Sequence, residues 1–198
     1  MMKKKTDLRI IRSKHSIKKA FIELLNEKGY EGITIQDIAD KAMINRNTFY
    51  LHYQNKPDLL NVSMDELLDE LKSTLKLCSS SKSTISGSML EQLMQTILEK
   101  IKDNIPFYKA FLLDENRIYG FQSKMEEIIK NTVEDGLDHT PLKISKELLL
   151  QYIASTFMGI VIWWVKNDFS YTPSELASQF GKILTHGHLT AAGIPIKD

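Results

Sequence analysis

Hydrogen-bonding side chains and aromatic rings are concentrated in residues 33–57, ITIQDIADKAMINRNTFYLHYQNKP. The segment contains a run of side chains that donate or accept hydrogen bonds: Arg46, Asn47, Thr48, Tyr50 and His52. Side chains of these types contact base edges in the major groove and phosphate oxygens along the DNA backbone. The segment therefore predicts a DNA-reading surface.

Apolar residues in the same segment predict two short helices joined by a tight turn. In the first helix, Ile38 and Ala42 lie four residues apart on one face, and Thr34 is a suitable N-cap. After a break at residues 43–44, Asn45 can cap a second helix whose Phe49 and Tyr53 face inward. Two helices in this arrangement place the second one in the major groove.

A third helix is expected to begin at Asn55, Lys56 and Pro57. The exposed amides of a helix N-terminus and a nearby lysine together favour a bound phosphate. Lys56 is therefore expected to anchor the DNA backbone.

The segment resembles the DNA-binding domain of the TetR family of bacterial transcriptional regulators, whose usual run is T-x-x-D-I-A-x-x-A-G-V-S-R-x-T-F-Y-x-H-F-x-x-K-x-x-L. The matching residues are Thr34, Asp37, Ile38, Ala39, Ala42, Arg46, Thr48, Phe49, Tyr50, His52, Lys56 and Leu59. Met43 stands where glycine is usual. If this turn position requires a positive φ, methionine carries strain that glycine avoids.

The resemblance implies a role for each side chain of the reading segment. Residues that resemble phosphate-contacting positions are Thr34, Tyr50, His52 and Lys56. Residues that resemble positions facing bases or adjacent phosphates are Asn45, Arg46, Asn47 and Thr48. The alternative is a small three-helix bundle with an ordinary solvated face, since polar residues lie opposite the apolar stripe of any surface helix.

Charge is distributed unevenly along the chain. The whole chain carries 26 Lys and Arg against 25 Asp and Glu, a net charge of +1. Residues 1–60 hold 12 basic and 7 acidic residues, which leaves a net charge of −4 for residues 61–198. A basic N-terminal part is typical of a nucleic-acid-binding end joined to a part with another task.

We expect an all-α protein of two domains. Residues 1–60 would form a three-helix helix-turn-helix domain with a basic tail at 1–6, and residues 61–198 a helical bundle for ligand binding and dimerisation. The expected helices cover residues 9–28, 56–77, 88–104, a short stretch from Pro106, 120–137, 144–166 and 172–189, with a turn at 139–143. Capping boxes are expected at Ser88 with Glu91 and at Thr172 with Glu175.

The last two helices are the most apolar part of the chain. The half of the helix around residues 157–165 is hydrophobic on nearly every side. The resemblance implies that this pair of helices forms a homodimer interface, and a two-fold dimer suits a pseudo-palindromic operator. The alternative is that the pair only closes a monomeric core.

Aromatic and methionine side chains of the C-terminal part could line a pocket for a small-molecule effector. The candidates are Phe107, Phe111, Phe121, Met125, Tyr152, Phe157 and Trp163. The same residues could instead be plain core. The C-terminal part loosely resembles the subgroup that includes dihydroxyacetone-kinase regulators, which does not indicate an effector.

Other classes of function lack sequence support. No phosphate-binding loop, dinucleotide-binding glycine pattern or nucleophile motif is present, and His186 and His188 are not spaced for one helical face, so we expect no catalysis, metal or cofactor. The apolar stretch around residues 152–165 is expected to be too short to span a bilayer, and the basic N-terminus does not resemble a signal peptide. A cytoplasmic, nucleoid-associated protein is expected.

The sequence thus predicts a sequence-specific DNA-binding transcriptional regulator. The predicted form is a homodimeric repressor that a small molecule releases from a palindromic, double-stranded operator. The alternative is an activator or co-regulator that acts through a protein partner without a ligand.

Overall fold

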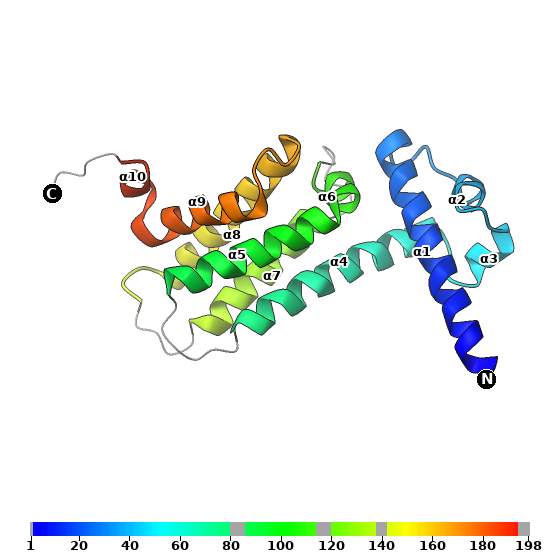
Figure 1. Ribbon diagram of the computed structural model, residues 1–198, viewed down its shortest axis with the longest axis horizontal. Coiled ribbons are helices and arrows are strands. Elements are labelled where there is room, and N and C mark those ends of the chain that lie inside the picture. Colours follow the sequence, from blue (N-terminus) through cyan, green and yellow to red (C-terminus); the bar gives the residue numbers. More distant parts are fainter. Residues whose placement is uncertain (1, 80–85, 114–119, 138–141, 194–198) are drawn as a thin grey trace. The chain divides into compact units, whose positions relative to one another are not determined.

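The protein is helical throughout the part of the chain that the computed structural model describes, residues 2–79, 86–113, 120–137 and 142–193. No strand occurs in these ranges (Figure 1). The all-α prediction is confirmed. The expected turn at 139–143 lies mostly outside the described residues.

The chain divides into two compact units, residues 1–67 and 68–198. The division falls inside one continuous helix, α4 (Lys56–Ser79). The boundary that we expected after residue 60 also lies within α4. A single helix therefore contributes residues to both units.

The N-terminal unit is built from α1 (Met2–Lys28), α2 (Ile35–Lys41), α3 (Arg46–Tyr50) and the first half of α4. Residues 2–6, which we expected to form a basic tail, are the first turns of α1. The core of the unit is apolar and consists of side chains contributed by all four helices, among them Ile17, Phe21, Ile38, Phe49 and Leu59. Burial of this kind is what holds short helices such as α2 and α3 in place.

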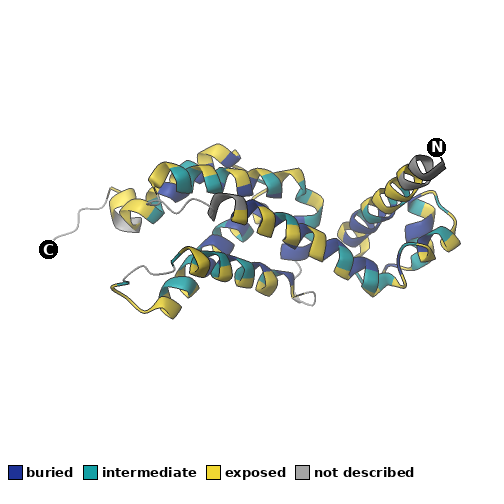
Figure 2. Ribbon diagram, turned by 90° about the horizontal axis from the view of Figure 1, so that it is seen from below, coloured by how far each residue is buried: buried dark blue, intermediate teal, exposed yellow. Residues whose placement is uncertain are grey.

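The C-terminal unit contains α5 (Gly87–Asp103), α6 (Ile105–Leu112), α7 (Phe121–Gly136), α8 (Lys146–Lys166), α9 (Pro173–His186) and α10 (His188–Ala191). Helix α5 packs along α9, α7 packs along α8, and α6 contacts both α7 and α8. Each long helix shows buried residues on one side and exposed residues on the other (Figure 2). The unit is thus a helical bundle with one apolar core.

Two predicted helix boundaries in the C-terminal unit were wrong. Helix α5 is capped by Ser86, whose hydroxyl accepts a hydrogen bond from the Met89 amide at 3.2 Å, so the predicted capping box of Ser88 with Glu91 lies inside the helix. Helix α9 ends at His186, because Gly187 adopts a positive φ of 77°. The predicted capping box of Thr172 with Glu175 is confirmed.

Helix α8 has 21 residues and is long and apolar enough, by length and composition, to cross a membrane. Our expectation that this stretch is too short was wrong, because the helix extends beyond residues 152–165 at both ends. One third of its apolar window is buried inside the protein. Its packing against α6 and α7 covers part of its apolar surface, whereas Leu148, Tyr152 and Trp163 are exposed.

The turn between α8 and α9 is held by side chains on both sides. Asp168 and Phe169 both adopt positive φ values, 50° and 58°. Lys109 donates to the Asp168 carboxylate at 2.7 Å, and the Phe169 ring meets the fully buried Trp164 ring edge to face with centroids 4.8 Å apart. These contacts offset the backbone strain of two adjacent left-handed residues.

Candidate DNA-binding interface

Helix α2 is started by a capping box. The Thr34 hydroxyl accepts from the Asp37 amide at 3.1 Å, and the Asp37 carboxylate accepts from the Thr34 amide at 2.8 Å. Several interactions lower the pKa of Asp37 to about 2, and the hydrogen bond from the Thr34 hydroxyl has the largest effect. The predicted N-cap at Thr34 is confirmed, and its exposed side chain lies at the start of α2.

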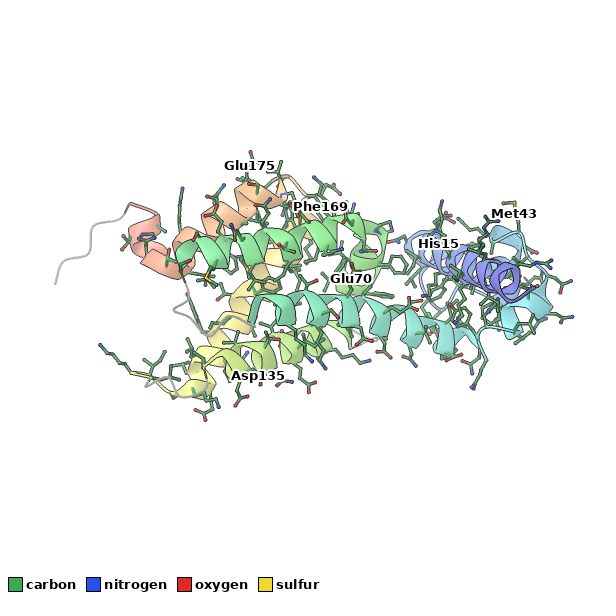
Figure 3. The ribbon with its side chains drawn as sticks, turned by 60° about the horizontal axis from the view of Figure 1, so that its bottom comes forward. His15, Met43, Glu70, Asp135, Phe169 and Glu175 are labelled. Atoms are coloured by element: carbon green, nitrogen blue, oxygen red, sulfur yellow. The ribbon has the colours of Figure 1, made fainter. Side chains whose placement is uncertain are left out.

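The turn between α2 and α3 uses a left-handed residue at the position where the family pattern has glycine. Met43 has φ = 54°, and its side chain is 92% exposed and projects away from the turn (Figure 3). The Met43 amide bonds to Asp40 O at 3.1 Å and the Ile44 amide to Ala39 O at 3.0 Å. These bonds close the end of α2 and set the direction in which α3 leaves it.

Helix α3 is held by its cap and by one buried ring. The Asn45 side chain accepts from the Asn47 amide at 2.8 Å, which confirms Asn45 as the N-cap. Phe49 is fully buried, and its ring centroid lies 5.8 Å from that of Tyr53. The inward orientation predicted for both rings is confirmed.

Burial of Phe49 sorts the remaining side chains of α3 into three stripes. Successive residues are rotated by about 100° around a helix, so residues four apart share a face. The stripe opposite Phe49 consists of Asn47 and Leu51, both exposed. Leu51 is the residue just after the last residue of α3, and its αR backbone (φ −71°, ψ −18°) continues the helical turn.

The first flanking stripe pairs a guanidinium with a phenol. Arg46 Nη2 donates to Tyr50 Oη at 3.1 Å, and Arg46 Cζ lies 5.7 Å from the centroid of the Tyr50 ring. Both side chains are exposed. The contact orients the Arg46 guanidinium along the helix while leaving most of its five donors available.

The second flanking stripe consists of Thr48 and His52, which are half-buried. Burial and, to a smaller extent, the charge of Lys14 on α1 lower the pKa of His52. This shift favours the neutral imidazole, which can donate one hydrogen bond to a phosphate.

Lys56 has a different environment from the one that we expected. Its Nζ donates to Tyr30 O at 2.8 Å and to Ile33 O at 2.9 Å, and lies 4.1 Å from the centroid of the Tyr30 ring. Two of its three donors thus tie the start of α4 to the loop that leads into Thr34. The first role of this lysine is to hold the loop between α1 and α2.

The predicted DNA-contacting residues come from three places in the N-terminal unit. Thr34 lies at the start of α2, six of the eight residues lie on α3 or directly beside its ends, and Lys56 is the first residue of α4. The sequence analysis assigned no role to Leu51. The 100° rotation from Phe49 would have placed Leu51 outward.

The predicted effector residues do not form a single cluster. Buried members of the set are Phe111, Phe121, Met125 and Phe157, and Phe107 is half-buried. The Phe111 and Phe121 rings meet with centroids 5.2 Å apart. Tyr152 and Trp163, in contrast, are 49% and 46% exposed on α8 and lie outside this cluster.

Comparison with known families agrees with this geometry. Residues 17–62 match the family described as "Bacterial regulatory proteins, tetR family", and residues 88–186, half of the chain, match "Transcriptional regulator C-terminal region". The chain belongs to the TetR family. The matched families and relatives are transcriptional regulators and not enzymes.

Two TetR-type relatives align over most of the chain. The HTH-type transcriptional regulator YxbF of Bacillus subtilis is 30% identical over 184 residues, which cover 91% of this chain and 47% of YxbF. The chain thus spans about half the length of YxbF. The negative regulator IcaR of the Staphylococcus aureus biofilm operon icaADBC is 25% identical over 173 residues, which cover 80% of this chain and 88% of IcaR.

Solved structures share the TetR fold. A TetR transcriptional regulator from Streptococcus agalactiae is 26% identical, with a TM-score of 0.61 over 90% of this chain and 97% of that one. FadR from Bacillus subtilis in complex with stearoyl-CoA is 19% identical, with a TM-score of 0.69 over 88% and 98% of the two chains. The dihydroxyacetone kinase operon activator DhaS is 21% identical, with a TM-score of 0.59 over 88% and 94%. At 19% and 21% identity the likeness to FadR and DhaS shows the fold alone.

Replacing Lys56 by methionine tests the loop-holding role. Lys56→Met keeps the alkyl chain but leaves the carbonyls of Tyr30 and Ile33 without their charged donor, so the free energy of unfolding should fall by about 2 kcal/mol. Chemical denaturation without DNA measures the effect. Lys19→Met, at an exposed lysine of α1, is the control and should change stability by less than about 0.5 kcal/mol. Equal stability of wild type and Lys56→Met would contradict the role.

The Tyr53 hydroxyl provides a second test of the packing beneath α3. Among the described residues, its Oη is buried without a hydrogen-bond partner, and burial raises the pKa of Tyr53 to about 12. Tyr53→Phe removes the unpaired hydroxyl and should raise the free energy of unfolding by about 1 kcal/mol. Denaturant titration checks this, with the exposed Tyr50→Phe as control. A loss of stability in Tyr53→Phe would show that the hydroxyl is satisfied, for instance by water.

Proposed function

We propose that the chain acts as a homodimeric repressor that binds a pseudo-palindromic, double-stranded operator and is released by a small-molecule effector. The observation that carries the proposal is the outward face of α3, where hydrogen-bonding side chains flank the exposed Asn47. Such a protein works on the chromosome, so we also propose a cytoplasmic, nucleoid-associated location. Residues 1–60 then serve DNA binding, and residues 61–198 serve dimerisation and ligand binding.

The DNA-reading roles follow from the three stripes of α3. An asparagine amide matches the N6 and N7 atoms of adenine, and a guanidinium matches the O6 and N7 atoms of guanine. We assign base contacts to Asn47 and Arg46. Contacts to phosphates are assigned to the hydrogen-bonding side chains around them: Thr34, Asn45, Thr48, Tyr50 and His52. The net charge of +5 in residues 1–60 favours the approach of this face to DNA.

The proposed contribution of Lys56 is partly indirect. It positions the loop before Thr34 through its bonds to two carbonyls, and one Nζ donor beyond these bonds can serve a phosphate. Loss of this residue would weaken binding to every DNA sequence, because the loop precedes the N-terminus of α2.

The exposed stripe of α8 supports a homodimer. Leu148, Tyr152 and Trp163 are large, apolar and exposed, and Ser155 and Gly159 lie between them on the same face. Nothing lies within 4 Å of a Cβ built on Gly159. Small residues flanked by large apolar ones permit close approach of a second helix, so the same stripe of a second copy can pack here.

A dimer also explains why one short helix could suffice for specificity. Two copies of α3 related by a two-fold axis can read half-sites about 34–36 Å apart. Each copy contributes the same contacts, so the binding free energy of the half-sites adds. A pseudo-palindromic operator is the expected partner.

An effector is proposed to bind among the buried aromatic residues of α6, α7 and α8. Phe111, Phe121, Met125 and Phe157 supply an apolar wall, which suits an acyl or aromatic compound. Support for release by such a ligand comes from FadR, whose structure holds stearoyl-CoA, and support for repression comes from IcaR, a negative regulator. Because α4 runs through both units, a shift of its C-terminal half would be carried to the reading unit.

Gly159→Arg should disrupt the dimer while leaving the subunit folded. The arginine adds bulk and charge to the centre of the α8 stripe, so light scattering should report a monomer. Affinity for a two-half-site operator, obtained by selection from random duplex DNA, should fall more than tenfold. Selection that recovers no inverted repeat would contradict the proposed operator.

Gly136→Arg is the matched control. Gly136 is also an exposed helical glycine with nothing within 4 Å of a built Cβ, but it lies at the end of α7. This variant should remain a dimer with wild-type affinity. A dimeric Gly159→Arg variant, or an equal loss in both variants, would contradict an interface through α8.

Effector release can be tested with stearoyl-CoA as the first probe and then with a compound library screened by thermal stabilisation. A compound that binds the bundle at saturation should weaken operator affinity at least tenfold, a coupling free energy of about 1.4 kcal/mol. Fluorescence anisotropy with labelled operator measures the change. A stabilising compound that leaves operator affinity unchanged at saturation would contradict ligand release and favour an activator or co-regulator working through a protein partner.

A further inference from the structure

Leu51 is an apolar side chain in the middle of a surface that otherwise donates and accepts hydrogen bonds. It is 80% exposed, and only Met43 is more exposed among the large apolar side chains that the structure describes. A single exposed leucine on a protein surface needs no explanation. The position of this one on the reading face is what distinguishes it.

Backbone geometry places Leu51 directly beside Asn47. The Leu51 amide donates to Asn47 O at 3.2 Å, so the helical turn includes both residues. Side chains four residues apart on a helix have Cβ atoms about 5–6 Å apart. Both lie opposite the buried Phe49, with the Arg46–Tyr50 pair on one side and Thr48 with His52 on the other. Leu51 is therefore at the outermost line of α3, where a major groove would be met first.

The major groove contains one prominent apolar group. The C5-methyl of thymine is the only methyl group among the four unmodified bases, and apolar side chains contact it. The neighbouring Asn47 amide has the donor and acceptor pattern that adenine requires. The Asn47–Leu51 stripe thus has the chemistry of a short A·T-containing step.

We infer that Leu51 packs against the C5-methyl of a thymine in each half-site and sets the preference for that base pair. The inference rests on the proposed DNA-binding function and adds a specificity residue to it. Contact with one methyl group removes about one CH₂-equivalent of apolar surface from water, which corresponds to about fourfold in affinity for each half-site.

Met43 is the other exposed apolar side chain of the reading segment and provides the comparison. It lies in the turn before the Asn45 cap, outside the helical stripe that Asn47 and Leu51 share. It is even more exposed than Leu51, but its backbone does not align it with the outer line of α3. A comparison of variants at these two residues therefore distinguishes the effect of an exposed apolar side chain from the effect of its position on α3.

The test replaces single thymines of the selected operator by deoxyuridine, which lacks only the C5-methyl group. Wild-type protein should lose about fourfold in affinity per half-site at one thymine position and little at the others. Leu51→Ala should bind the thymine operator more weakly than wild type and show no further loss with deoxyuridine at that position. Because Leu51 is exposed, the variant should keep the wild-type melting temperature.

Met43→Ala is the control, and it should retain the full dependence on the thymine methyl. Retention of that dependence by Leu51→Ala, its loss in Met43→Ala, or a selected half-site without thymine would overturn the inference while leaving DNA binding intact. Unchanged operator affinity in Leu51→Ala would also overturn it and would favour a protein partner for this side chain. Failure of the wild-type protein to select any sequence would instead overturn the proposed function itself.

Discussion

The proposed DNA-binding surface depends on the burial of one aromatic ring. Helix α3 has five residues, too few to be stable by its own hydrogen bonds in water. Phe49 is fully buried against the core of the N-terminal unit, and the orientation of every other side chain of α3 follows from that anchor. The hydrogen-bonding face is in this sense a by-product of hydrophobic packing.

Two further constraints fix how this helix is presented. Met43 accepts a left-handed backbone so that α2 and α3 can meet at a tight turn, at a cost in conformational strain that glycine would not have. Lys56 ties the first turn of α4 to the carbonyls of the loop before α2. A residue whose position in the family pattern indicates DNA contact thus also supports the fold, since one ammonium group carries three donors.

In the N-terminal unit, packing of α3 leaves mainly hydrogen-bonding side chains exposed. In the C-terminal unit, packing of α8 leaves large apolar side chains exposed. Helix α8 is apolar on nearly all sides, yet the bundle covers only the side that contains Ala154, Phe157, Val161 and Trp164. Leu148, Tyr152 and Trp163 remain in solvent within one chain. A surface of this kind is costly for a monomer in water, which is the physical basis for the proposed dimer.

Helical periodicity and capping chemistry are local, and the sequence alone therefore determined the all-α class, the N-caps at Thr34, Asn45 and Thr172, and the family. Side-chain environment depends on residues far apart in the chain, and here prediction was incomplete. Only the tertiary structure decided that Lys56 bonds to Tyr30 and Ile33, because a lysine at a helix start has the same local pattern whether it contacts a carbonyl or a phosphate. Likewise Leu51, Tyr152 and Trp163 are apolar residues at helical positions, and only packing determines which faces of a helix are covered by the rest of the chain.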